Sequence, residues 1–151
     1  MKRHIEKIKK MFSGLVSSDF ASFKEVSAKK NITGVYIIYS PMEEVLYIGS
    51  TNKFNIRFGT DLKHESTHTL MRKLLKQEIF RDRKIALKYL STQCKFRILT
   101  CDDKREAEAL EHFTIYLMAM QSFQLEKMHK DQTFSLLESK TLKIQFQIQF
   151  G

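Results

Sequence analysis

The spacing of hydrophobic residues changes several times along the chain, and each spacing predicts a different element. Residues 2–12 and 19–30 carry apolar side chains at helical intervals, and Ser18 or Asp19 can cap the second of these helices. We expect the two helices to form an N-terminal addition, residues 1–30, that packs against the remainder of the chain.

Two β-rich runs, GVYIIY and EVLYIG, follow on either side of the turn signal SPME at 40–43. β-branched and aromatic residues fill both runs, so the sequence predicts a β-hairpin. If the turn closes Tyr39 onto Glu44, antiparallel counting places Tyr36 directly opposite Tyr47. Two phenol groups would then lie on one face of the sheet.

Two further helices are expected after the hairpin. One of residues 50–52 caps the first, which runs to about His64. Its apolar row consists of Phe54, Phe58 and Leu62. The second helix begins at residue 66 or 67, ends near Phe80 and is followed by the basic stretch RDRKIALKYL. Its core-facing side chains are expected to be Leu70, Met71 and Leu74.

The residue pattern from 95 onward predicts a strand, a long helix and another strand. KFRILT at 95–100 is the third strand, and the helix covers CDDKREAEALEHFTIYLMAMQ. Asp103 and Glu106 have the spacing of a capping box at its start. TLKIQFQIQF alternates apolar and polar residues, so the extension 131–151 is expected to form an extra strand at a sheet edge or in a homodimer contact.

The composition is that of one globular domain, residues 1–151, with a strongly basic balance. Hydrophobic residues make up 42% of the chain, which also has only one Pro and five Gly, so it can bury a core. Its 26 Lys and Arg against 17 Asp and Glu give a net charge of +9. That excess favours nucleic acid ahead of a membrane surface, although it also fits an ordinary soluble protein.

The sequence also predicts a compartment. The first residues lack the apolar run of a signal peptide, and no window approaches a membrane span. Cys94 and Cys101 flank the third strand and would lie ~23 Å apart at about 3.3 Å per residue, too far for a disulfide. Unpaired thiols favour a reducing environment. We therefore expect an intracellular protein, cytoplasmic or nuclear, that is not secreted and does not enter a membrane.

Two tripeptides and two later residues resemble one nuclease family. Ten residues separate Gly34-Val35-Tyr36 from Tyr47-Ile48-Gly49. YIGSTNKFNIR then passes from strand to helix and ends in Arg57, and ALEHFTI carries Glu111. This order over residues 34–124 is similar to the GIY-YIG nuclease family. The resemblance implies an α+β fold with a small three-stranded antiparallel sheet flanked by helices.

The same resemblance implies an activity and a role for each site residue. It implies hydrolysis of phosphodiester bonds in DNA, assisted by one Mg²⁺ or Mn²⁺. Tyr36 or Tyr47 would position or deprotonate the attacking water, Arg57 would hold the scissile phosphate, and Glu111 would bind the metal. Because the unperturbed pKa of tyrosine is about 10, Arg57, Lys53 or the metal would have to lower it.

Glu111 is also singled out by its place on the predicted helix. Its neighbours at helical spacing include Ala107, Ile115 and Met118, so its carboxylate lies beside the apolar stripe and needs a partner. A buried structural ion pair is the alternative to a metal. Glu108 lies one turn from Lys104 and is expected to be an ordinary surface residue.

Further residues are candidates for the site and for substrate contacts. The sequence departs from the family pattern at Asp61, where the family has Tyr or His. The nearest histidines are therefore candidates: His64 to assist catalysis and His68 to bind substrate. Gln124 stands where the family often has Asn. The other substrate-binding candidates are the basic residues Lys53, Arg72 and Lys76, each of which could equally lie on a solvated face.

Three other functions compete with a nuclease. The stretch HESTH at 64–68 fits the zinc-protease pattern H-E-x-x-H, but Ser66 and Thr67 interrupt helices and no third ligand stands out, so we expect no zinc site. A nucleic-acid-binding module with the nuclease fold but without cleavage is the main alternative. A dimerising structural protein built on the C-terminal strand is the third.

Overall fold

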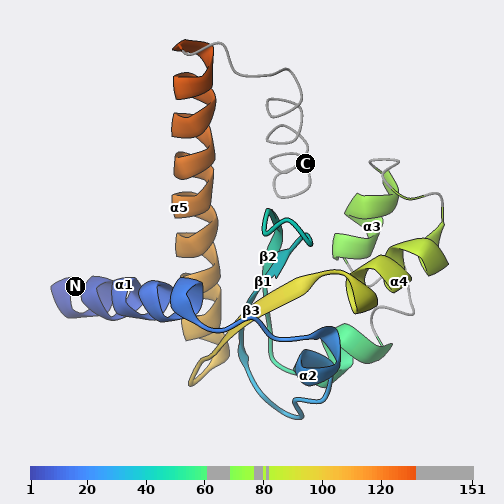
Figure 1. Cartoon of the computed structure of the whole chain (residues 1–151). Coiled ribbons are helices and arrows are strands. Elements are labelled where there is room, and N and C mark those ends of the chain that lie inside the picture. Colours follow the sequence, from blue (N-terminus) through green and yellow to red (C-terminus); the bar gives the residue numbers. More distant parts are fainter. Residues whose placement is uncertain (61–68, 77–79, 81, 132–151) are drawn as a thin grey trace.

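The centre of the fold is a three-stranded antiparallel sheet in which β1 (Gly34–Tyr39) lies between β2 (Val45–Thr51) and β3 (Lys95–Thr100), as Figure 1 shows. The structure is a computed structural model and describes residues 1–60, 69–76, 80 and 82–131. The α+β class, the hairpin and the third strand are as predicted. The expected C-terminal strand and the HESTH stretch lie outside the described residues.

The register of the hairpin differs from the prediction by two residues. Tyr36 pairs with Gly49 and not with Tyr47. The turn occupies residues 40–44, closed by a 2.8 Å hydrogen bond between its two end residues, and Leu46 is left out of the ladder as a bulge. A shift of two positions keeps every side chain on its own face of the sheet. Tyr36 and Tyr47 therefore share one face as expected, but they lie diagonally.

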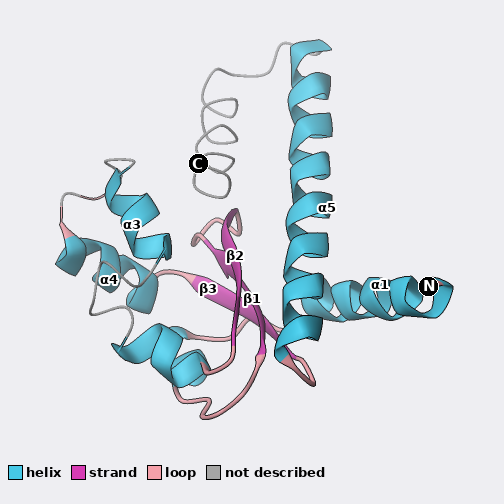
Figure 2. Cartoon of the chain, turned by 180° about the vertical axis from the view of Figure 1, so that it is seen from behind, coloured by secondary structure: helices cyan, strands magenta, loops and turns pink. Residues whose placement is uncertain are grey.

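Helices cover the two faces of the sheet in separate layers. α1 (Lys2–Ser17) and α5 (Lys104–Asp131) cover one face, and shorter elements cover the other, as Figures 1 and 2 show. The shorter elements are α2 (Phe23–Ser27), the π-helical turn η1 (Ile56–Thr60), α3 (Thr69–Lys76) and α4 (Arg83–Thr92). Side chains of β1 alternate between the layers: Val35 and Ile37 pack under α1 and α5, and Tyr36 and Ile38 under the short elements.

The two N-terminal helices have other bounds than the sequence predicts. α1 continues to Ser17. α2 begins only at Phe23, where Ser22 and Glu25 form a capping box. The expected start at Ser18 or Asp19 is wrong because the backbone of Ala21 is paired with Phe96 of β3, with N–H to carbonyl distances of 2.7 and 3.0 Å.

The segment after the hairpin also begins differently. β2 continues through Thr51, so two of the three expected helix caps are strand residues. The helical turn begins beyond Lys53 and buries Phe54 and Phe58, as predicted. From Arg83 onward, the basic stretch RDRKIALKYL lies in α4, a helix that the hydrophobic pattern did not single out. Asp82 caps it by accepting a 2.9 Å hydrogen bond from the Ile85 N–H.

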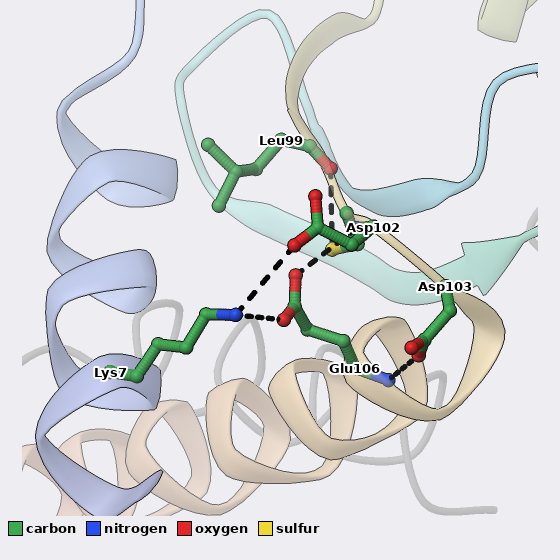
Figure 3. A network of polar contacts seen from close by, with 6 residues as sticks. Lys7, Leu99, Asp102, Asp103 and Glu106 are labelled. Atoms are coloured by element: carbon green, nitrogen blue, oxygen red, sulfur yellow. Dashed lines mark hydrogen bonds and ion pairs between the residues drawn. The ribbon is translucent and has the colours of Figure 1, made fainter. Parts of the chain in front are cut away.

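The N-terminal addition is tied to the start of α5 by a network of polar contacts, drawn in Figure 3. The Glu106 N–H donates to Asp103 at 2.8 Å, as the capping box predicts, but the Glu106 carboxylate accepts from the N–H of Asp102 instead of Asp103. Lys7 of α1 donates to Glu106 at 2.5 Å and lies 3.7 Å from Asp102. The hydrogen bond from Lys7 lowers the pKa of Glu106. The expected packing of residues 1–30 on the remainder of the chain is confirmed.

Two other expectations concern the cysteines and membrane segments. Cys94 and Cys101 are both buried and form no disulfide, as their separation along β3 predicts. Burial raises the pKa of Cys94 to about 12 and that of Cys101 to about 11, so neither is a reactive thiolate. Within the described ranges, no helix combines the length and the apolar character that crossing a membrane requires.

Candidate active site

A pocket of about 590 Å³ opens beside the edge strand β2. Its walls come from both layers of the fold: from β1 and β2, from the start of η1 and the segment before it, and from the first two turns of α5. The pocket can draw on both layers because β2 is at the edge of the sheet, so residues above and below this strand meet around it. The predicted site residues Tyr36, Tyr47, Lys53, Arg57 and Glu111 all line it.

The two tyrosines lie side by side on the pocket wall. Their rings are stacked, with centroids 6.2 Å apart and an interplanar angle of 26°. Tyr36 is only 1% exposed and contacts the ring of Phe58 edge-on at 4.9 Å. A Cβ atom on Gly49 would lie 2.5 Å from the Tyr36 hydroxyl oxygen, closer than atoms can approach. Gly49 is therefore required because the phenol of Tyr36 crosses the backbone there.

Arg57 is held at the pocket by its neighbours on the helical turn. Phe54 and Phe58 are 0% and 3% exposed, and they fix the turn in the core on either side of the arginine. The Arg57 N–H donates to the Lys53 carbonyl at 3.0 Å. Its side-chain Nε is buried and has no hydrogen-bond partner among the described residues. A buried guanidinium donor without a partner is costly unless a ligand such as an anion accepts from it.

Glu111 lines the pocket from α5. It is half-buried, and Leu110 and Thr114 beside it on the helix are fully buried. The hydroxyl of Ser50 on β2 donates a hydrogen bond to Oε2 of Glu111. The partner that the sequence demanded for this carboxylate is therefore a neutral hydroxyl. No ion pair to Glu111 is formed within the described part of the chain.

Glu108 is exposed, as expected, and also lines the pocket. It does pair with Lys104, at 3.8 Å, and its side chain is 49% exposed. Both residues nevertheless line the pocket together with Glu111, because positions three apart on a helix share one face. The prediction that Glu108 is a surface residue beside Lys104 is confirmed, and only its place on the pocket wall was not predicted. The sequence analysis also missed Ser50, which it treated as a candidate helix cap. Extending the alternation of the strand one residue past Gly49 would have placed the Ser50 side chain on the face opposite the tyrosines.

The donors in the pocket suit one hard divalent cation. Where the structure describes the chain, it contains no group of three or more His, Cys, Asp or Glu that could enclose a metal. Two carboxylates, Glu108 and Glu111, do line the pocket. Mg²⁺ typically takes one or two carboxylates and keeps several waters, whereas a structural zinc site needs four nitrogen or sulfur ligands. The chemistry of these two carboxylates therefore fits a hard divalent cation such as Mg²⁺ or Mn²⁺.

Among the described residues, the other predicted site residues do not line the pocket. Arg72 and Lys76 are exposed on α3, in the layer with η1. Gln124 is exposed on α5, thirteen positions beyond Glu111 and hence about 20 Å away along the helix. His64 and His68, like Asp61, lie outside the described residues. The substrate-binding and catalytic roles of these residues stay predictions.

Comparison with known proteins gives one match. The model of the GIY-YIG catalytic domain matches residues 32–124, a range that contains all three strands and every pocket residue named above. No curated protein and no solved structure matches the chain. A match to this catalytic domain over more than half of the chain supports a nuclease-type function in general. With the motif residues, the sheet and the match in agreement, the chain belongs to the GIY-YIG family.

Proposed function

We propose that the protein is an endonuclease that hydrolyses phosphodiester bonds in DNA and depends on Mg²⁺ or Mn²⁺. One observation carries the proposal. Two tyrosines, an arginine with an unpartnered buried donor and a hydrogen-bonded glutamate line the same pocket, although they come from four different elements. Hydrolysis of a phosphodiester needs a positioned water, cations at the non-bridging oxygens and a site for a metal.

Each side chain in the pocket has a task that its chemistry suits. Arg57 binds the scissile phosphate through its planar guanidinium, and Lys53 adds a second positive charge at the same wall. One of the two phenols orients the attacking water and accepts its proton. A neutral phenol is a very weak base, so that tyrosine must first lose its own hydroxyl proton. The nearby cations favour this loss by lowering the pKa of the tyrosine.

Glu111 would hold the divalent cation, which supplies positive charge to the phosphate and lowers the pKa of bound water. The half-buried position of Glu111 keeps its carboxylate at a fixed place on the wall. Glu108 lies one turn earlier on the same wall and is paired with Lys104. That pairing leaves Glu111 as the carboxylate without a cationic partner within the described residues.

DNA is the proposed substrate because of the charge outside the pocket. The chain carries a net charge of +9, and Arg72 and Lys76 are exposed on α3. Lysines and arginines on one surface bind the DNA backbone without reading its sequence. Gln124 and the two histidines, His64 and His68, are retained as candidates for further substrate contacts.

The experiment is cleavage of a supercoiled plasmid by the purified protein with Mg²⁺, with Mn²⁺ and with excess EDTA. We expect nicked and linear products in both metals and none in EDTA. Binding to a short duplex is measured on the same preparation at several salt concentrations. Salt-sensitive binding without cleavage in either metal would replace the proposal with the alternative, a nucleic-acid-binding module that has the nuclease fold. Absence of both would favour a structural role.

A further inference from the structure

The direction of the Ser50 side chain follows from the alternation of β2. Ser50 pairs with Val35 across the hairpin, and paired residues lie on the same face of a sheet. Val35 is buried in the core beneath α1 and α5. The hydroxyl of Ser50 therefore points toward α5, away from the face that carries Tyr36 and Tyr47, and it reaches Oε2 of Glu111.

This contact joins two elements that are 61 residues apart in sequence. A glutamate side chain on a helix has several rotamers, and a hydrogen bond from a rigid strand selects one of them. An ionised carboxylate has two oxygens with about four acceptor sites, so one hydrogen bond leaves capacity for a cation. The strand thus orients the carboxylate without neutralising its charge.

Glu108 provides the contrast within the same pocket. Its partner is Lys104 on the same helix, at 3.8 Å, and the two side chains are 49% and 69% exposed. Such a pair is solvated and holds its carboxylate loosely. Of the two carboxylates on the pocket wall, Glu111 accepts a hydrogen bond from the sheet, whereas Glu108 is paired with a lysine of its own helix.

We propose that Ser50 is a positioning residue that holds Glu111 in the orientation in which it binds the catalytic divalent cation. The proposal rests on the proposed function, since it needs Glu111 to be the metal ligand. Hydrogen bonds to metal-binding carboxylates commonly contribute 10–100-fold to metal affinity. A residue that only filled space in the strand would have no such effect.

The test compares Ser50→Val with Ser50→Thr, two variants of nearly equal shape of which only the second keeps a hydroxyl. Mn²⁺ binding is measured from the EPR signal of the free ion. The titration uses the full chain with a short DNA duplex in the Arg57→Ala background, where DNA can be present without being cut. We expect Ser50→Val to weaken Mn²⁺ binding by about 10–100-fold and Ser50→Thr to restore it to within about 3-fold of the parent.

Ser13→Ala is the matched control, because Ser13 is exposed on α1 and its hydroxyl donates to the Lys9 carbonyl of its own helix. This variant should bind Mn²⁺ like the parent. Equal Mn²⁺ affinity of Ser50→Val and Ser50→Thr would overturn the inference about Ser50. The proposed function would still stand if the protein with native Arg57 cleaves DNA. If the parent neither binds Mn²⁺ nor cleaves with native Arg57, the proposed function fails and the inference fails with it. Thermal melting of both Ser50 variants confirms that they fold.

Discussion

The two faces of the sheet are packed with different side chains and contribute different parts of the pocket. The face under η1, α3 and α4 is aromatic: rings of Tyr36, Phe58 and Phe96 contact each other edge-on at 4.9 and 5.5 Å. The face under α1 and α5 is mainly aliphatic, with Leu15, Ile37 and Leu110 fully buried. The aromatic face provides the tyrosines and the aliphatic face provides Ser50 and Glu111.

This difference explains why the pocket is at the sheet edge. Side chains on opposite faces of a sheet are separated by its backbone and meet only around an outer strand. β2 is such a strand, so Tyr47 on one face and Ser50 on the other can line one cavity. The tightly packed aromatic layer holds the phenols and Arg57 in place, while the carboxylate depends on α5. The following changes test the two contributions separately.

The largest effect is expected from Glu111→Gln, which removes the proposed metal ligand of the aliphatic side. The amide keeps the shape and can still accept from Ser50, so the fold should be unchanged. Cleavage should be abolished, while DNA binding stays near normal or becomes slightly tighter because a negative charge near phosphate is lost. Cleavage and duplex binding are measured on one preparation.

Because Glu108 lines the same pocket, it is no control for Glu111→Gln. Glu6→Gln is the suitable one: Glu6 is a helical glutamate on α1, 74% exposed, and lies 3.9 Å from Lys9. It should cleave like the parent. Cleavage that persists in Glu111→Gln would show that the metal is held elsewhere.

Arg57→Ala removes the proposed phosphate-binding group of the aromatic side. The buried Phe54 and Phe58 still anchor the helical turn, so the variant should fold. Losing one charged group that stabilises the transition state typically costs about 10²–10³ in rate, and we expect a fall of at least that size in plasmid cleavage. Lys30→Ala is the control, because Lys30 is exposed and does not line the pocket. A rate equal to that of the parent would refute the assignment of Arg57.

Gly49→Ala tests how closely the aromatic side is packed. The new Cβ would lie 2.5 Å from the Tyr36 hydroxyl oxygen, so the phenol has to move. We expect a loss of about 1–3 kcal/mol in the free energy of unfolding, measured by urea denaturation, together with reduced cleavage. Gly14→Ala on α1 meets only Leu99 Cδ1 at 3.8 Å and should be neutral or stabilising. Equal stability of the two variants would contradict the close contact.

The smallest effect is expected from Lys7→Gln, which breaks the link between α1 and α5. Lys7 lowers the pKa of Glu106, so their interaction stabilises the fold above the unfolded pKa of Glu, about 4.3, and is lost as pH falls through the folded value. Thermal melting from pH 7 to pH 3 should show a slightly lower melting temperature for the variant at pH 7. The difference should vanish near the acid end. Lys9→Gln, whose partner Glu6 is well exposed, should show no change at either pH.

The sequence by itself determined the parts of the protein that depend on neighbours along the chain. The hairpin and β3 follow from β-branched and aromatic runs, and the start of α5 follows from the capping pair Asp103 and Glu106. The assignment of Tyr36, Tyr47, Arg57 and Glu111 to one site followed from the resemblance to the GIY-YIG family. The structure places all four on one pocket wall, and their chemical roles stay predictions.

Only the tertiary structure decided the features that join distant segments. The hairpin register depends on the conformation of the turn at 40–44 and on the bulge at Leu46, and neither is encoded by the apolar pattern. α2 starts late because Ala21 pairs with β3. The bond from Ser50 to Glu111 spans 61 residues. Contacts of this kind exist only once the sheet is packed against its helices, because packing brings together groups whose separation along the chain carries no local signal.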